Sequence, residues 1–274
     1  MNSKISTKVQ QAIEEDLQHG DVTAELIPLE NTLTFQLLSR EKCILCGTEW
    51  FNESFIQIDP SCKIDWQASD GDKISADSII CTIIGNARSL LTAERTALNF
   101  LQTLSGTATI TYSFNQLIKH TRCKLLDTRK TIPLLRQEQK YAVSCGGGVN
   151  HRIGLFDAYL IKENHIAASE SITLAVQTAR QMHPELLLEV EVENLVQLNE
   201  AIEAKVDRVL LDNFTTEQLK EAVEMNKDHV ELEASGDITQ NNIAKIAETG
   251  VNFISIGALT KHVRAIDFSL RYSE

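Results

Sequence analysis

The chain has 274 residues, 43% of them hydrophobic and 23% charged, which is enough to bury one large core or two modest ones. Its net charge of −12 argues against nucleic acid or an anionic membrane as the partner. No apolar run reaches the roughly 20 residues that a membrane span needs, and the N-terminus lacks the apolar region of a signal peptide. We therefore expect a globular protein of the cytoplasm.

Positive charge is concentrated in one segment of this acidic chain. Residues 119–165 carry nine Lys and Arg against four Asp and Glu, so the remainder of the chain carries a charge of −17. A basic pocket in an acidic protein suggests a small anionic ligand, but on charge count alone a solvated basic face is favoured.

The six cysteines are too sparse for a disulfide framework in a chain of this length. Cys43 and Cys46 have CxxC spacing, but no second pair and no histidine cluster lies nearby. We therefore interpret them as small strand or core residues and predict no zinc site. The motifs GxGxxG, GxxxxGK[ST], GxSxG and HExxH do not occur, so a Rossmann cofactor or a P-loop nucleotide is unsupported.

The first 110 residues show a mixed pattern of helix and strand signals. A helix is predicted over residues 4–18 and a second over 87–104, ending near Gly106. Between them, short β-like runs predict strands at 33–39, 42–47, 63–66 and 79–84. This combination indicates a separate α+β domain.

From about residue 120 the pattern changes to strands alternating with amphipathic helices. Six strands are predicted, at 124–128, 158–162, 186–193, 208–212, 230–235 and 252–257. Helices are predicted over 169–182, 195–204, 216–225 and 240–249. The last four strands recur roughly every 21 to 23 residues, which is typical of parallel βαβ units.

Six such units could form an incomplete barrel or an open, doubly wound sheet. Glu189, Glu191 and Glu193 alternate with Val190 and Val192, so the three carboxylates point to one face of their strand. Carboxylates beneath a packed helix layer would be costly, whereas a polar barrel mouth accommodates them. A small or incomplete α/β barrel of the TIM type is therefore favoured over the doubly wound sheet.

Every predicted strand of this second half ends in charged, small or hydrogen-bonding residues. These strand ends are residues 127–130, 162–165, 191–193, 212–213, 235–237 and 256–258. Catalytic groups of α/β barrels lie at the C-terminal ends of the strands. A single polar strand end is only a loop, but six that combine cations with carboxylates indicate an active site.

The last two strand ends carry small residues. Ser235-Gly236-Asp237 and Gly257-Ala258 each lead from a strand toward a predicted helix, where backbone N–H groups and the helix dipole favour an anion. A phosphate site at the final two strands recurs in barrels. Each glycine alone could be a plain turn residue, but together they indicate a phosphate monoester.

Four cationic residues could bind a second anionic group: Arg129, His151, Arg152 and Lys162. Arginine binds carboxylates bidentately, and such charge-assisted bonds are worth roughly 1.5–3 kcal/mol each. Glu191 and Asp212 could hold Mg²⁺ through water, stabilise a developing cation, or form structural ion pairs with nearby Lys and Arg. These three alternatives remain open from the residues alone.

Residues 128–166 resemble the core segment of the quinolinate phosphoribosyltransferase family, through TRKT, CGGGVNHR and IKENH. Further matching segments, in collinear order, are EEDLQHGDVTAELIP (14–28), ERTALNFLQTLSGTAT (94–109), EVEVEN (189–194), LLDNF (210–214), LEASGDI (232–238) and ISIGALT (254–260). The resemblance implies an N-terminal α+β sandwich-like domain of residues 1–110, joined by the C-terminal tail 265–274. It also implies an incomplete α/β barrel of residues 111–264 that carries the active site.

The resemblance implies a pentosyltransferase of de novo NAD synthesis. Quinolinate and phosphoribosyl pyrophosphate would give nicotinate mononucleotide, pyrophosphate and CO₂, with Mg²⁺ as cofactor. One alternative is a related phosphoribosyltransferase for another aromatic acid, which the full set of cations disfavours. A second is a ligand-binding protein that has lost catalysis, which the presence of Lys130, Glu191 and Asp212 disfavours.

Roles carry over position by position in the resemblance. The quinolinate pocket would comprise Arg129, His151, Arg152 and Lys162. The catalytic residues, on the phosphoribosyl pyrophosphate side, would be Lys130, Glu191 and Asp212, with Mg²⁺ held by the two carboxylates indirectly, through water and pyrophosphate. The 5′-phosphate cradle would comprise Ser235, Gly236, Gly257 and Ala258. Three further substrate-binding positions are Thr128, Asp237 and Ile256.

The resemblance alone implies a homodimer in which Arg95 acts across the interface and one N-terminal domain caps the partner's barrel. Two positions depart from the family pattern. Leu134 stands where Gly is frequent, and Asp237 stands where Gly or Asn is common. An extra carboxylate beside a phosphate is unfavourable, which puts a role for the Asp237 side chain in doubt.

Overall fold

The computed structural model describes residues 2–273, and the side chains of residues 3–273. The chain divides into two compact units: unit 1 is Met1–Ile110 with Val263–Glu274, and unit 2 is Thr111–His262. Within the described part of the chain, no helix has the length and apolar character needed to cross a membrane.

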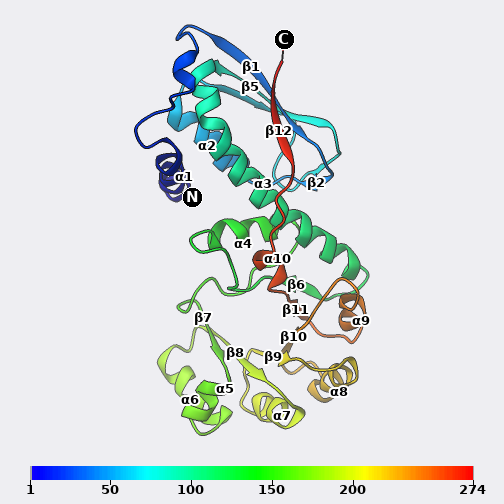
Figure 1. Cartoon of the computed structure of the whole chain (residues 1–274). Helices are drawn as coiled ribbons and strands as arrows, with labels where there is room; N and C mark the ends of the chain where they lie inside the picture. The colour runs from blue at the N-terminus through cyan, green and yellow to red at the C-terminus, as the bar shows by residue number, and fades with distance from the viewer. Residues whose placement is uncertain (1, 274) are drawn as a thin grey trace. The chain divides into compact units, whose positions relative to one another are not determined.

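Unit 1 contains a four-stranded antiparallel sheet in the order β12–β1–β5–β3. Figure 1 labels its strands β1, β5 and β12. Its strands are β1 (Thr32–Ser39), β3 (Lys63–Trp66), β5 (Ser78–Asn86) and β12 (Phe268–Tyr272), and a separate pair joins β2 (Cys43–Ile44) to β4 (Lys73–Ile74). Its remaining elements are α1 (Asn2–Leu17), the 3-10 helix η1 (Ala24–Leu26), α2 (Thr48–Ile58) and the first part of α3 (Ala87–Ile118). Because β12 pairs with β1, the C-terminal strand is part of this unit's sheet.

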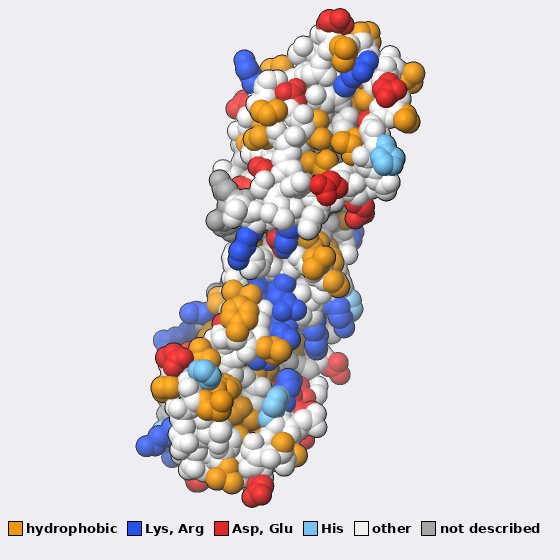
Figure 2. Space-filling view, turned by 90° about the vertical axis from the view of Figure 1, so that its left-hand side faces the viewer, with side chains coloured by type: hydrophobic (Ala, Val, Ile, Leu, Met, Phe, Trp, Pro, Cys, Tyr) orange, Lys and Arg blue, Asp and Glu red, His pale blue; other side chains and the backbone are white. Residues whose placement is uncertain are grey.

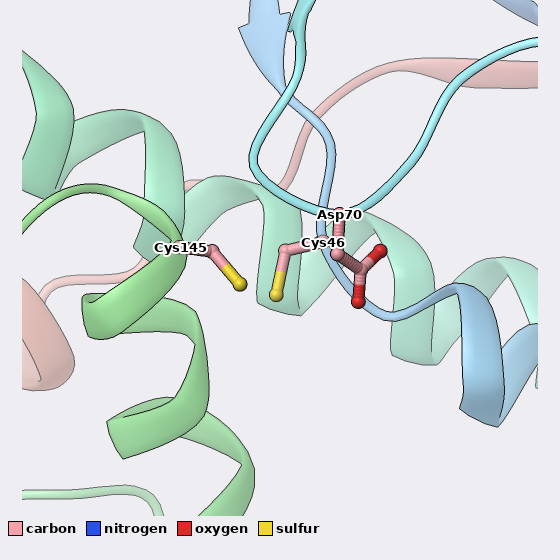
Figure 3. Close-up of side chains that lie close together, drawn as sticks. All are labelled: Cys46, Asp70 and Cys145. Carbon is pink, nitrogen blue, oxygen red and sulfur yellow. The ribbon is translucent and has the colours of Figure 1, made fainter.

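Helix α2 is absent from the sequence prediction, and the reason is a cap from far along the chain. The carboxylate of Asp70, on the loop between β3 and β4, accepts the backbone N–H groups of Gly47 and Thr48 at 3.1 Å. Figure 3 shows the Asp70 side chain next to Cys46. Such a non-local partner leaves no local start signal. Cys43 and Cys46, close by in the chain, are buried, as expected for small core residues.

Helix α3 continues to Ile118, so the predicted end near Gly106 is wrong. Gly106 lies inside the helix at a place where a Cβ atom would come within 2.2 Å of the carbonyl oxygen of Arg264. The glycine therefore permits a close backbone approach within unit 1 and does not terminate the helix.

Unit 2 contains one six-stranded parallel sheet in the order β6–β11–β10–β9–β8–β7. Its strands are β6 (Lys124–Leu126), β7 (Ala158–Ile161), β8 (Leu187–Val192), β9 (Arg208–Asp212), β10 (Glu231–Ser235) and β11 (Phe253–Ser255). Its helices after α3 are α4 (Arg136–Cys145), α5 (Glu163–Ala168), α6 (Ile172–Met182), α7 (Leu195–Glu203), α8 (Thr216–Asn226), α9 (Ile243–Ala247) and α10 (Ala258–Lys261). All six predicted strands of this half are present.

The strand order identifies an incomplete barrel. From β7 to β11 the strands follow one another without the reversal of a doubly wound sheet, and β6 then pairs with β11. Among the described residues no ladder joins β6 to β7. Instead Val149, after α4, lies beside β6, where its N–H donates to the carbonyl of Leu125 at 2.8 Å. The predicted α/β class with an incomplete barrel is therefore confirmed.

Strand β8 shows how the alternating sequence serves two faces. Leu188, Val190 and Val192 are fully buried, and helices α6 and α7 pack against this strand. Glu189 and Glu191 alternate with them and lie on the opposite face, where Glu191 lines a pocket. The inner face of the sheet is therefore the one that carries charge.

Gly106→Ala should lower the free energy of unfolding by about 1–3 kcal/mol, because the new Cβ atom has no room beside Arg264. The better helix propensity of alanine, about 1 kcal/mol, offsets only part of this loss. Asn99→Ala, at an exposed position of the same helix, is the control and should be neutral or stabilising. Urea denaturation measures both, and an equally stable Gly106→Ala variant would contradict the close approach.

Candidate active site

The strand ends of unit 2 surround one pocket of about 630 Å³, a size that suits a small-molecule ligand. It is lined by all the predicted substrate-binding residues of this unit: Thr128, Arg129, Lys130, His151, Arg152, Lys162, Glu191, Asp212, Ser235, Gly236, Asp237, Ile256, Gly257 and Ala258. Lys and Arg side chains gather on one face of unit 2 (Figure 2). Arg95 belongs to unit 1, where its exposed side chain lines a smaller pocket of about 250 Å³.

Two guanidinium groups form the cationic side of the large pocket. Burial, followed by the nearby positive charge of Arg129, lowers the pKa of Arg152. Arg152 Nη1 donates to the carbonyl oxygen of Ala158 at 3.2 Å, at the start of β7. Arg129 Nε is buried and has no hydrogen-bond partner. Two half-buried cations that repel each other, one with an unused donor, favour an anionic ligand.

Carboxylates occupy the ends of the neighbouring strands β8 and β9. Glu191 forms an ion pair with Lys162 from the end of β7. Asp212 accepts a hydrogen bond from Asn213 Nδ2 at 2.9 Å. The strand ends that carry negative charge, those of β8 and β9, therefore lie next to the end of β7, which carries Lys162.

Two glycines allow side chains of the pocket to pack closely against the backbone at the ends of β10 and β11. Gly236 has φ +103°, and a Cβ atom there would lie 2.0 Å from Asn213 Oδ1. A Cβ atom on Gly257 would lie 2.9 Å from the Lys130 side chain. Sequence reasoning missed Lys261, which lines the same pocket and belongs to the short helix α10.

One expectation about the phosphate turns is wrong. Helix α9 begins only at Ile243, so the turn at residues 235–237 does not lead directly into a helix N-terminus. The turn after β11 does lead into α10, but that helix spans only Ala258–Lys261. In both turns, backbone N–H groups can therefore donate hydrogen bonds to an anion, with little additional help from a helix dipole.

Both departures from the family pattern lie at left-handed backbone positions. Leu134 has φ +67° and Asp237 has φ +45°. Glycine adopts this region freely, and aspartate tolerates it better than other L residues do. Asp237 therefore fits its turn, whereas Leu134 holds a strained conformation.

The pocket is supported by Asp127, which is fully buried at the end of β6. Its carboxylate pairs with Lys140 of α4 and accepts the backbone N–H of His151 at 2.9 Å and Asn150 Nδ2 at 2.7 Å. Lys140 Nζ also donates to the carbonyl oxygen of His151 at 2.8 Å. This network fixes the backbone at residues 150–151, immediately before Arg152.

A second buried group lies at the floor of the pocket. Glu189 and Glu233 have no exposed area and make no hydrogen bond of good geometry, but Nε2 of His151 lies 2.9 Å from Glu189 Oε2, within ion-pair distance. Burial raises the pKa of Glu189 to about 7, and burial with the charge of Glu189 raises the pKa of Glu233 to about 8. Arg208 Nη1 lies 3.7 Å from Glu233. The sequence analysis placed Glu189 on this face but missed Glu233, although it alternates with Leu232 and Ala234 in the same way.

The models of the quinolinate phosphoribosyl transferase C-terminal and N-terminal domains match residues 107–271 and 21–105. The probable nicotinate-nucleotide pyrophosphorylase (carboxylating) of Synechocystis is 39% identical over 267 residues, with 96% of this chain and 90% of that protein covered. The corresponding enzyme of Mycobacterium leprae is 39% identical over 272 residues, covering 96% and 95%. The solved nicotinate-nucleotide pyrophosphorylase of Francisella tularensis superposes with a TM-score of 0.98 at 50% identity, covering 100% and 97%.

Glu233→Gln should make stability less dependent on pH. A carboxyl group with a pKa raised from 4.5 to about 8 takes up a proton on folding, so its contribution to stability falls as pH rises from about 5 to 9. The variant should therefore lose less unfolding free energy over this range than the parent chain. Urea denaturation at several pH values tests this, with exposed Glu221→Gln as control. Parallel curves for Glu233→Gln and the parent would contradict it.

Proposed function

The chain belongs to the quinolinate phosphoribosyl transferase family, and we propose that it transfers phosphoribosyl from phosphoribosyl pyrophosphate to quinolinate with loss of CO₂. The products are nicotinate mononucleotide, pyrophosphate and CO₂, as in de novo NAD synthesis. One observation carries the proposal: the order of charges around the sheet. Cations lie at β6 and β7, carboxylates at β8 and β9, and glycine turns at β10 and β11. This order suits a dicarboxylate beside a phosphorylated sugar.

The cationic side would bind the two carboxylates of quinolinate. Arg129, Arg152 and Lys162 supply the charges, and His151 lines the same part of the pocket. Bidentate guanidinium contacts to both carboxylates would fix the ring and direct its nitrogen toward the ribose. Such positioning supplies a large part of the rate.

The opposite strand ends would bind phosphoribosyl pyrophosphate. The turns at Gly236 and Gly257 would hold the 5′-phosphate through backbone N–H groups, together with Ser235 and Ala258. Three further lining positions, Thr128, Asp237 and Ile256, would contact the sugar phosphate or its surroundings.

Departure of pyrophosphate leaves positive charge on the ribose ring. Glu191 and Asp212 would stabilise this charge, and Lys130 would neutralise the leaving group. The ring nitrogen of quinolinate then bonds to the anomeric carbon, from which pyrophosphate has departed with the electron pair of the broken bond. In the resulting pyridinium the bond to the 2-carboxylate breaks, its electron pair passes to the ring carbon, and a proton replaces CO₂.

Mg²⁺ fits the carboxylate side of the pocket. Glu191 and Asp212 lie at the ends of neighbouring strands and present oxygen donors toward the place assigned to pyrophosphate. Mg²⁺ is commonly held by one or two carboxylates, phosphate oxygens and retained water. When bound, it would supply positive charge to the leaving pyrophosphate.

A homodimer would complete the site. Arg95 is exposed on α3 and shares its small pocket with Val22 and Leu91, which are 78% and 39% exposed. Beyond Arg152 in unit 2, Leu155 and Phe156 are each 75% exposed. Mutual burial of these two apolar surfaces in a two-fold dimer would bring each Arg95 to the partner's pocket. Six cysteines in 274 residues are too few for a disulfide framework, which fits a cytoplasmic enzyme.

Purified protein with Mg²⁺, phosphoribosyl pyrophosphate and quinolinate labelled with ¹³C in its 2-carboxylate should release labelled CO₂ and form nicotinate mononucleotide. Nicotinate should react at least about tenfold less efficiently, because it lacks one charge-assisted carboxylate contact. Mass spectrometry and chromatography measure both products. Absence of product from quinolinate, or equal use of nicotinate, would contradict the proposed reaction.

Inactive Arg95→Ala and Asp212→Ala subunits, when denatured and refolded together, should regain activity. Random pairing gives hybrids in half of the dimers, each with one intact site, so about one quarter of wild-type activity is expected. Glu191→Ala mixed with Asp212→Ala is the matched control, because both residues belong to the same barrel and no hybrid site is intact. A first mixture as inactive as this control would show that Arg95 does not act across an interface.

A further inference from the structure

His151 links the pocket to the buried carboxylates beneath it. Its Nδ1 atom accepts the backbone N–H of Arg152 at 2.7 Å. An atom that accepts this hydrogen bond carries no proton, so the ring holds its single proton on Nε2. Nε2 lies 2.9 Å from Glu189 Oε2 and 3.5 Å from Glu233 Oε2. The imidazole thus holds its only N–H group within ion-pair distance of the buried pair.

The same hydrogen bond argues against a metal ion at these three residues. A metal bound at Nε2 would need the ring proton on Nδ1, where the N–H of Arg152 already points. Arg208 also supplies positive charge to the buried carboxylates. Its guanidinium lies 3.7 Å from Glu233 and stacks at 4.0 Å on the ring of Phe253. The buried carboxylates are therefore oriented toward protein groups.

Two fully buried carboxylates are an expensive way to stabilise a fold. Apolar side chains of similar size usually serve stability as well or better. Polar groups buried next to a binding site are better explained by the orientation that they impose on the groups in contact with ligand. In unit 2 the group that the buried carboxylates would orient is His151, and the Nδ1 atom of His151 in turn holds the backbone of Arg152.

We propose that Glu189 and Glu233 are positioning residues for the substrate pocket. They hold His151 as its Nε2–H tautomer, His151 holds the backbone N–H of Arg152, and Arg152 presents its guanidinium to a quinolinate carboxylate. The assignment of the ligand rests on the proposed function. His151 then contributes to binding through Arg152, because each of its ring nitrogens is directed to a protein group.

Two different networks hold the backbone and the ring of His151, the residue that precedes Arg152. Asp127 and Lys140 hold the N–H and carbonyl groups of His151, while the buried carboxylates orient its ring. Substitutions at Glu189 or Glu233 should therefore leave the segment in place and loosen only the orientation of Arg152. Quinolinate affinity should suffer selectively.

Calorimetric binding of quinolinate, and of phosphoribosyl pyrophosphate with Mg²⁺, tests the selectivity. Glu189→Leu removes the carboxylate that lies beside His151 Nε2 and should weaken quinolinate binding about tenfold or more, with phosphoribosyl pyrophosphate changed less than about twofold. Glu189→Gln keeps an acceptor for His151 and a donor for Glu233, so it should stay close to wild type. Exposed Glu221→Leu on α8 is the control. Equal loss for both ligands, no loss in Glu189→Leu, or a Gln variant as weak as Leu would overturn the proposal.

A double-mutant cycle separates positioning from general damage. If Glu189 acts through Arg152, Glu189→Leu should add little further loss of quinolinate affinity in an Arg152→Ala background. Additive losses would overturn the assigned route through Arg152.

Histidine-selective ¹⁵N NMR of the free protein tests the tautomer without any substrate. His151, identified among the seven histidines by the loss of its signals in His151→Asn, should show a protonated Nε2 and an unprotonated Nδ1. An Nδ1–H tautomer or an imidazolium at neutral pH would overturn the proposal. Because this result needs no ligand, it decides the positioning role even if the turnover assay rejects quinolinate as substrate.

Discussion

The buried carboxylate of Asp127 is the contact on which the pocket depends. No ladder joins β6 to β7 among the residues that the structure describes, so the segment after α4 lies beside β6 with few backbone hydrogen bonds to hold it. Asp127 provides the missing restraint by binding Lys140, Asn150 and the backbone of His151. Arg129, from the end of β6, and Arg152, from the restrained segment, are thereby brought to one side of the pocket.

Further carboxyl groups are buried beneath the pocket. Asp127, Glu189 and Glu233 have no exposed area, and burial raises the pKa of each carboxyl group. A core selected for stability alone would favour apolar residues at these positions. Their presence directly beneath the pocket is typical of proteins in which a preorganised site lowers the stability of the fold.

Much of unit 2 could be predicted from its sequence, because strand alternation and polar strand ends are local signals. Glu191, Asp212 and Gly257 were placed at strand ends, and parallel strands bring such ends together at one edge. In unit 1, helix α2 depends on a cap from Asp70, and Gly106 serves a contact with the C-terminal segment. Neither partner can be identified from residues close by in the chain.

The missed parts of the site have the same cause. Lys140 counted as one of nine cations in a basic segment, and only the packing of α4 shows that it is buried against Asp127. The alternation of Glu233 with Leu232 and Ala234 was a local signal for its face, but its approach to Arg208 follows only from the pairing of β9 with β10. The role proposed for Arg95 rests on family resemblance, since its exposed position on α3 carries no signal of its own.

A crystal structure with nicotinate mononucleotide bound tests the assignment of the pocket most directly. The ligand carboxylate should lie between Arg129 and Arg152, and its 5′-phosphate should lie at the turns of Gly236 and Gly257. A phosphate bound by the two arginines, or a ligand outside this pocket, would contradict the division into a dicarboxylate side and a phosphate side.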